Sequence, residues 1–123
     1  MFSGEAYAAA NVEALRATSF AAGANNGPFI DVSQYEGDLK FIFNLGAVTG
    51  SVILKLQDAT DAGGTGVADL SPAVQTASLS TAGTTAALIV DKRKARSHIR
   101  LVATVTTGPI LIAGVLQARQ KTA

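Results

Sequence analysis

Few residues of the chain have side chains that could do catalytic or metal chemistry. His98 is the only histidine among the 123 residues, and the chain contains no cysteine. One chain therefore cannot form a site with two histidine ligands or a relay between histidines, and it has neither a thiolate nucleophile nor a disulfide. A lone histidine in a polar stretch is most often a surface or interface residue. We therefore predict no catalytic site, no cofactor and no bound metal.

Three aspartates lie in a glycine-rich stretch that begins at Asp58 and ends at Asp69. Calcium prefers oxygen ligands, but an EF-hand loop needs acidic or amide side chains at its third and fifth positions and a glutamate at its twelfth. The third and fifth positions here are Thr60 and Ala62, and the twelfth is an aspartate. The glycines at 63, 64 and 66 are not followed by the lysine of a phosphate-binding loop. A solvated, mobile surface loop is the expected structure.

The most informative charged feature is a cluster of basic residues, since half of the ten bases lie between positions 92 and 100. Residues of equal parity share one face of an extended chain. The members of equal parity are Lys92, Lys94, Arg96, His98 and Arg100. Such a face could bind protein or nucleic acid, or could be a solvated turn. Nucleic acid is disfavoured because the cluster has no aromatic residue for stacking and no recognition helix is indicated.

Composition points to assembly. Charged residues make up 15% of the chain, against roughly 25% in an average soluble domain, so much of the surface is uncharged or covered by partners. The net charge is +1, but residues 1 to 70 carry −5 and residues 71 to 123 carry +6. Separate acidic and basic patches on one domain would follow. No signal peptide or apolar run long enough for a membrane span is present, which predicts a protein made in the cytosol.

Alternating apolar and polar residues predict β-strands along most of the chain. The clearest run is 38 to 46, and the glycines at 46 and 50 suggest a turn that joins it to a second run as a β-hairpin. Another strong turn signal lies at 25 to 28, in the sequence Asn-Asn-Gly-Pro. The segment 110 to 117 is apolar on both faces, so we expect it to be central or covered by another subunit. The expected strands are 17–22, 38–46, 51–57, 73–80, 84–90, 97–105 and 110–117.

These elements predict an all-β domain, an antiparallel β-sandwich or jelly roll of seven or eight short strands, over residues 18 to 123. The Ala-rich residues 1 to 17 are expected to form a short helix or an arm that orders on a neighbouring molecule. The predicted core consists of Leu39, Phe41, Phe43, Val52, Leu54, Leu56, Ile99, Leu101 and Val105.

Two stretches resemble a known family. Residues 30 to 40 with the glycine turn at 46 to 51, and Val90-Asp91 with the strand 97 to 105, are similar to small structural proteins encoded in the head gene clusters of tailed bacteriophages. The resemblance implies a jelly-roll-like decoration, or cement, protein that binds the major capsid protein on the outside of an HK97-type shell. It also implies a homo-oligomer located in the virion, with no direct contact to nucleic acid or membrane.

A docking hypothesis follows for the shell contact. Lys92, Lys94, Arg96 and Arg100 are expected to face acidic shell surface and to set orientation and association rate. Ile110, Ile112 and Leu116 are expected to supply most of the affinity by apolar burial. Two alternatives stay open: a component of the tail or head–tail junction, and a receptor- or carbohydrate-binding sandwich. The second is disfavoured because the chain has no Trp and only two tyrosines for stacking on sugars.

Overall fold

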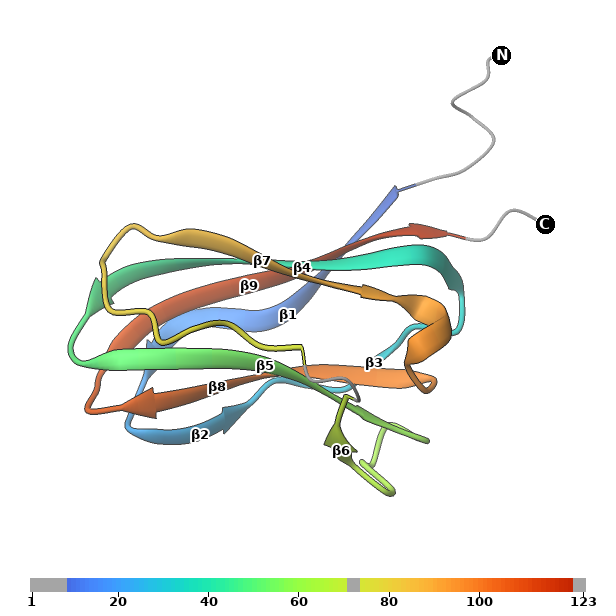
Figure 1. Cartoon of the computed structure of the whole chain (residues 1–123), viewed down its shortest axis with the longest axis horizontal. Helices are drawn as coiled ribbons and strands as arrows, with labels where there is room; N and C mark the ends of the chain where they lie inside the picture. Colours follow the sequence, from blue (N-terminus) through green and yellow to red (C-terminus); the bar gives the residue numbers. More distant parts are fainter. Residues whose placement is uncertain (1–8, 71–73, 121–123) are drawn as a thin grey trace, which may run out of the picture.

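Two antiparallel sheets pack face to face in a computed structural model, which describes residues 9 to 70 and 74 to 120 (Figure 1). One sheet has the order β1-β9-β4-β7, and the other has the order β2-β8-β5-β6 with β3 also paired to β8. The strands are β1 (Ala9–Phe20), β2 (Gly23–Asn26), β3 (Ile30–Asp31), β4 (Tyr35–Val48), β5 (Ser51–Ala59), β6 (Ala68–Asp69), β7 (Thr85–Asp91), β8 (His98–Thr106) and β9 (Ile110–Gln120). The chain is therefore nearly all-β, as the sequence predicted.

The predicted core is confirmed, because the inward faces of the strands meet between the two sheets. Phe41 and Phe43 of β4 are completely buried, and all nine predicted core residues are at most 3% exposed. Alternation along β4, β5 and β8 identifies the buried side of each strand because successive side chains point to opposite faces.

The prediction of a hairpin between residues 38–46 and 51–57 is wrong. β4 pairs with β7 and β9, whereas β5 pairs with β8 and β6 in the other sheet. The turn at Thr49 and Gly50 therefore carries the chain from one layer to the other. Gly50 has φ +82°, and a Cβ there would overlap the carbonyl oxygens of Thr106 and Thr107. Alternation shows which side of each strand is buried, but it does not distinguish a neighbour in the same sheet from a partner across the core.

The N-terminal segment also differs from the prediction. Residues 9 to 17 are neither helix nor arm, because they form most of β1, which pairs with β9. Ala14 and Leu15 are buried in the core, at 0% and 3% exposure. Backbone pairing to a strand about one hundred residues away compensates for the few large side chains, and composition could not reveal it. Residues 1 to 8 lie outside the described part of the chain.

The turn expected at residues 25 to 28 is wrong as well. Asn25 and Asn26 belong to β2, and the Gly27 backbone N–H donates to the Leu101 oxygen at 2.8 Å. Gly27 is needed for close approach, since a Cβ there would overlap the Ala14 carbonyl oxygen. The chain turns earlier, before Gly23, which has φ +115°.

The segment expected as strand 73–80 is only partly strand-like. Val52 forms an isolated bridge with Leu79, and Lys55 forms one with Gln75, so this segment runs along the edge of β5. Residues 71 to 73 lie outside the described part. The neighbouring prediction of a strand over 84–90 is confirmed by β7.

The buried phenylalanines give a direct test of the fold. Phe41→Ala is expected to lower the free energy of unfolding by about 3 to 5 kcal/mol, because it removes a fully buried ring and leaves a cavity. Ile89→Ala is the matched control, since Ile89 is 54% exposed on the outer face. Denaturant unfolding of both variants measures the difference, and a loss below about 1 kcal/mol for Phe41→Ala would contradict the observed register.

Candidate functional site

The predicted basic face does not form, because the chain is not extended over the cluster. Residues Lys92–Lys94 form a 3₁₀ turn, η2, between β7 and β8. The Asp91 carboxylate caps this turn by accepting from the Arg93 backbone N–H at 3.0 Å. A 3₁₀ turn has three residues per turn, so residues two apart do not share a face. Lys92 and Lys94 are thus separated from Arg96 and Arg100, which lie beyond the turn.

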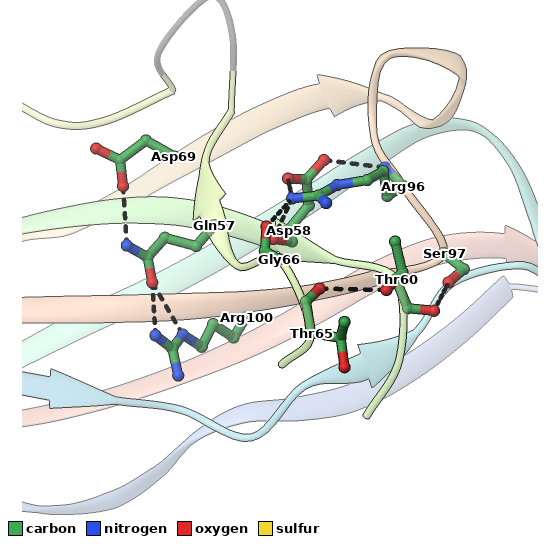
Figure 2. A network of polar contacts seen from close by, with 9 residues as sticks. All are labelled: Gln57, Asp58, Thr60, Thr65, Gly66, Asp69, Arg96, Ser97 and Arg100. Carbon is green, nitrogen blue, oxygen red and sulfur yellow. Dashed lines mark hydrogen bonds and ion pairs between the residues drawn. The ribbon is translucent and has the colours of Figure 1, made fainter. Parts of the chain in front are cut away.

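Arg96 binds within its own chain (Figure 2). Its Nη2 donates to Asp58 Oδ1 at 2.9 Å, to the Asp58 backbone oxygen at 2.9 Å and to the Gly66 oxygen at 2.7 Å. The Arg96 backbone N–H donates to Asp58 Oδ2 at 3.0 Å. Asp58 is only 7% exposed and continues the inward-facing parity of β5. Arg96 thus neutralises a buried carboxylate and holds the loop after β5 against the start of β8.

Arg100 is also engaged by its own chain. Its Nε and Nη2 donate to the Gln57 side-chain oxygen at 3.0 and 2.7 Å, and its guanidinium lies 4.7 Å from the centre of the Phe29 ring. Gln57 in turn donates to Asp69 at 2.9 Å, and Lys55 forms an ion pair with Asp69 at 3.1 Å. Figure 2 shows Asp69, Gln57 and Arg100 in a row across β6, β5 and β8. Arg96 and Arg100 therefore hold segments of their own chain together, and this conflicts with the docking roles predicted for them.

Charge remains exposed at the η2 turn. The Arg93 side chain is 87% exposed, and its Nη2 lies 2.8 Å from Asp91 Oδ2. Hydrogen bonds from Arg93 lower the pKa of Asp91 to about 2. Lys94 is exposed and Lys92 is half-buried. Within the predicted cluster, the exposed bases are thus Arg93 and Lys94, both on this short turn.

The apolar part of the docking hypothesis is wrong. Ile110, Ile112 and Leu116 are 0%, 1% and 0% exposed, because these residues of β9 point into the core. β9 is a central strand between β1 and β4, which was one of the two arrangements expected for a strand apolar on both faces. The residues of β9 that reach the surface are the alternate ones, and Leu111 is 44% exposed.

The outer face of the β1-β9-β4-β7 sheet carries two of the three large apolar side chains that are exposed among the described residues. A shallow groove of about 270 Å³ crosses it where β1, β9 and β4 run side by side. Its lining includes Glu13, Ala17, Ile42, Asn44, Ala113 and Val115. Ile89 on β7 adds an exposed apolar side chain on the same face. In the sequence, this surface was indicated by the odd-numbered apolar residues of β9, which lie on the face opposite the buried even-numbered ones.

The three aspartates of the stretch from 58 to 69 are held apart. Asp58 binds Arg96, Asp61 accepts from the Thr65 hydroxyl at 2.6 Å, and Asp69 binds Gln57. Within the described residues, no three acidic or histidine side chains gather to hold a metal ion. The Asp61 contacts order the loop from 60 to 67, and they lower the pKa of that carboxyl.

His98 begins β8 and is half-buried. Its Nδ1 lies 2.7 Å from the Ser97 hydroxyl, and its backbone pairs with Asp31 of β3 and Ala59 of β5. These contacts hold His98 at the end of the sandwich.

No helix in the described ranges has the length and apolarity required to cross a membrane.

Comparison with known proteins identifies solved structures with a similar fold. No protein-family model and no curated protein sequence matches the chain. Among solved structures it is similar to the SPBc2 prophage-derived protein YomS, with a TM-score of 0.59 and 13% identity over 91% of this chain and 95% of that one. It is also similar to a structure of infectious bursal disease virus, Gx strain, with a TM-score of 0.52 and 13% identity over 93% of this chain and 32% of that chain. At such identities the likeness shows a shared β-sandwich fold.

Removing the Arg96 side chain tests whether it is structural. Arg96→Ala is expected to lower the free energy of unfolding by about 1 to 3 kcal/mol, because it leaves the buried Asp58 carboxylate without its charged partner. Arg93→Ala, which removes a largely exposed guanidinium, is the control and should leave stability nearly unchanged. Equal unfolding midpoints for the two variants would contradict the structural role of Arg96.

The capped turn predicts an unusual titration for one carboxyl. The pKa of Asp91 is lowered from 3.8 to about 2, so the exposed pair with Arg93 contributes a small, solvent-screened stability above the unfolded-state pKa of about 3.9 and loses it as the pH falls through the folded value. NMR titration of the Asp91 carboxyl should give a midpoint near pH 2. In Arg93→Ala the midpoint should rise toward the ordinary value, and an unchanged midpoint would show that the arginine is not the cause.

Proposed function

We propose that the chain is a structural protein of a tailed-bacteriophage virion, which binds the outside of an HK97-type capsid and stabilises it by bridging capsomers. The observation that carries the proposal is the fold likeness to a prophage-derived protein over 95% of that protein's length. The likeness to part of a chain from a virus structure supports the coarser part, a virion-associated structural role. Under this proposal the chain acts through its surfaces and has no catalytic role.

The surface of the sandwich suits attachment to a large protein partner. Two large apolar side chains on the outer face of the β1-β9-β4-β7 sheet, Ile89 and Leu111, are 54% and 44% exposed. Burial of such groups contributes about 25 cal/mol per Å² and can supply affinity. Exposed ion pairs contribute only about 0.2 to 1 kcal/mol each and are screened by salt. Charge at the η2 turn would therefore set chiefly the orientation and rate of attachment.

The structure changes which residues should be tested for this role. Reversal of Arg96 or Arg100 would disturb the contacts with Asp58 and Gln57, so slower attachment of those variants would not identify a docking surface. Lys94 is exposed on η2, so its charge can be reversed with the fold intact. Arg16 of β1 is also exposed and provides a matched control on another part of the surface.

Attachment to capsids lacking this protein tests the proposal. The wild-type protein is expected to co-sediment with purified shells at a copy number close to that of the major capsid protein, and to raise their resistance to heat. Lys94→Glu should slow attachment on the order of tenfold in low salt, with a smaller effect in high salt. Arg16→Glu should attach at the wild-type rate. A copy number far below that of the shell protein, with the protein found at the tail or neck of intact particles, would overturn the capsid role.

A further inference from the structure

The edge strand β7 has one side without a partner among the described residues. β7 pairs with β4 and with no other described strand. Among the described residues, the one side-chain hydrogen bond in residues 85 to 90 joins the Thr85 hydroxyl to Asn44 of β4, so no described side-chain hydrogen bond caps the other side of the strand. An uncovered strand edge is a row of backbone donors and acceptors that favours pairing with another extended strand.

The register identifies the unpaired backbone groups. The Leu45 N–H donates to the Thr84 oxygen at 2.8 Å, and residues 43 and 41 of β4 lie opposite residues 86 and 88. In an antiparallel pair the residues bonded to the partner alternate with residues whose N–H and C=O point the other way. The backbone groups of Thr85, Ala87 and Ile89 therefore point away from β4. The side chains of these three residues are all exposed on the outer face.

The other sheet edges are protected in ways that β7 is not. β2 and β6 are only four and two residues long, and the segment around Gln75 and Leu79 covers β5. β1 is longer, but two register shifts interrupt it and it carries the charged residues Glu13 and Arg16. Short strands, bulges and charges are the usual means of preventing edge pairing. From Thr85 to Val90, β7 has no proline, glycine or charged residue.

We propose that β7 is a self-association edge, which pairs antiparallel with β7 of a second copy across a two-fold axis. A two-fold pairing that overlaps the whole of Thr85–Asp91 places Leu88 opposite Leu88 of the other copy. It places Ala87 opposite Ile89, so the residues whose backbone groups point outward on one copy face the same set on the other. The edge is self-complementary in this register, as an isologous interface requires.

Side chains and charges are compatible with this pairing. The exposed Ile89 of each copy would lie beside Ala87 of the other, on one continuous outer face. Asp91 of each copy would lie opposite Thr85, so no like charges are directly opposed within the paired strands. A second copy fits this edge better than an unrelated strand because the edge supplies both halves of the pairing. The proposal does not depend on the capsid role, since the free protein tests it.

Sedimentation and light scattering of the purified protein over a range of concentrations test the proposal. The wild type is expected to form a dimer, and Ile89→Lys should weaken dimerisation at least about tenfold by placing a charge at the paired edge. Leu111→Lys is the matched control, because Leu111 is similarly exposed on the same face but lies on β9, away from the edge. Ala87→Pro is a second test, since it removes an outward N–H without breaking a bond to β4.

Spin labels provide a measurement that does not rely on weakening the dimer. The chain has no cysteine, so Ile89→Cys and Leu111→Cys can each be labelled at a single site. The proposed register puts the two Ile89 Cα atoms about 8 Å apart, so strong coupling between copies is expected at 89 and not at 111. A wild type that stays monomeric at about millimolar concentration overturns the proposal. A dimer lost in Leu111→Lys but kept in Ile89→Lys would overturn it too, in favour of contact through the outer face.

Discussion

The whole fold depends on the burial of one face of every long strand in the layer between the two sheets. β4 contributes Leu39, Phe41 and Phe43 to this layer, and β5 and β8 contribute side chains from the opposite sheet. Because side chains alternate along a strand, a shift of one residue would exchange the buried set for the exposed set. The same constraint decides which residues can meet a partner. On β9 it buries Ile110, Ile112 and Leu116 and leaves Leu111 at the surface.

Asp58 shows what happens where a polar residue occupies an inward position. Its place in β5 continues the buried parity, at the end of the sandwich where β5 and β8 meet the connecting loops. A buried carboxylate is costly unless it is paired and hydrogen-bonded. Arg96 supplies both interactions, and its bond to the Gly66 oxygen ties the loop to the same point. The sequence suggested that Arg96 could bind a partner protein. In the structure its bonds stabilise the end of the domain instead.

The surfaces that remain suit a protein that acts by association. The outer face of the β1-β9-β4-β7 sheet carries two large exposed apolar side chains, Ile89 and Leu111, and the edge strand β7 lacks the usual protection against pairing. Two exposed bases, Arg93 and Lys94, lie on η2, where the Asp91 carboxylate caps the turn. Apolar contact, edge pairing and a small charged turn are elements of interfaces, as the proposed virion role requires.

The alternation of apolar and polar residues was enough to predict the class of fold, because a strand with one buried face has apolar side chains at every second position. The buried residues of β4, β5 and β8 were predicted correctly for that reason, as was the position of β7. Which strands are neighbours was decided by tertiary structure: β4 and β5 lie in different sheets, and β1 pairs with a strand at the other end of the chain.

The candidate site depended on tertiary structure even more. Parity in an extended chain predicted one basic face, but the 3₁₀ turn at Lys92–Lys94 and the buried Asp58 separate its members. Residue types and their spacing determine which side chains are more stable when buried and which need a polar or charged partner. The residue that packs against or pairs with each of them is set by contacts between segments far apart in sequence.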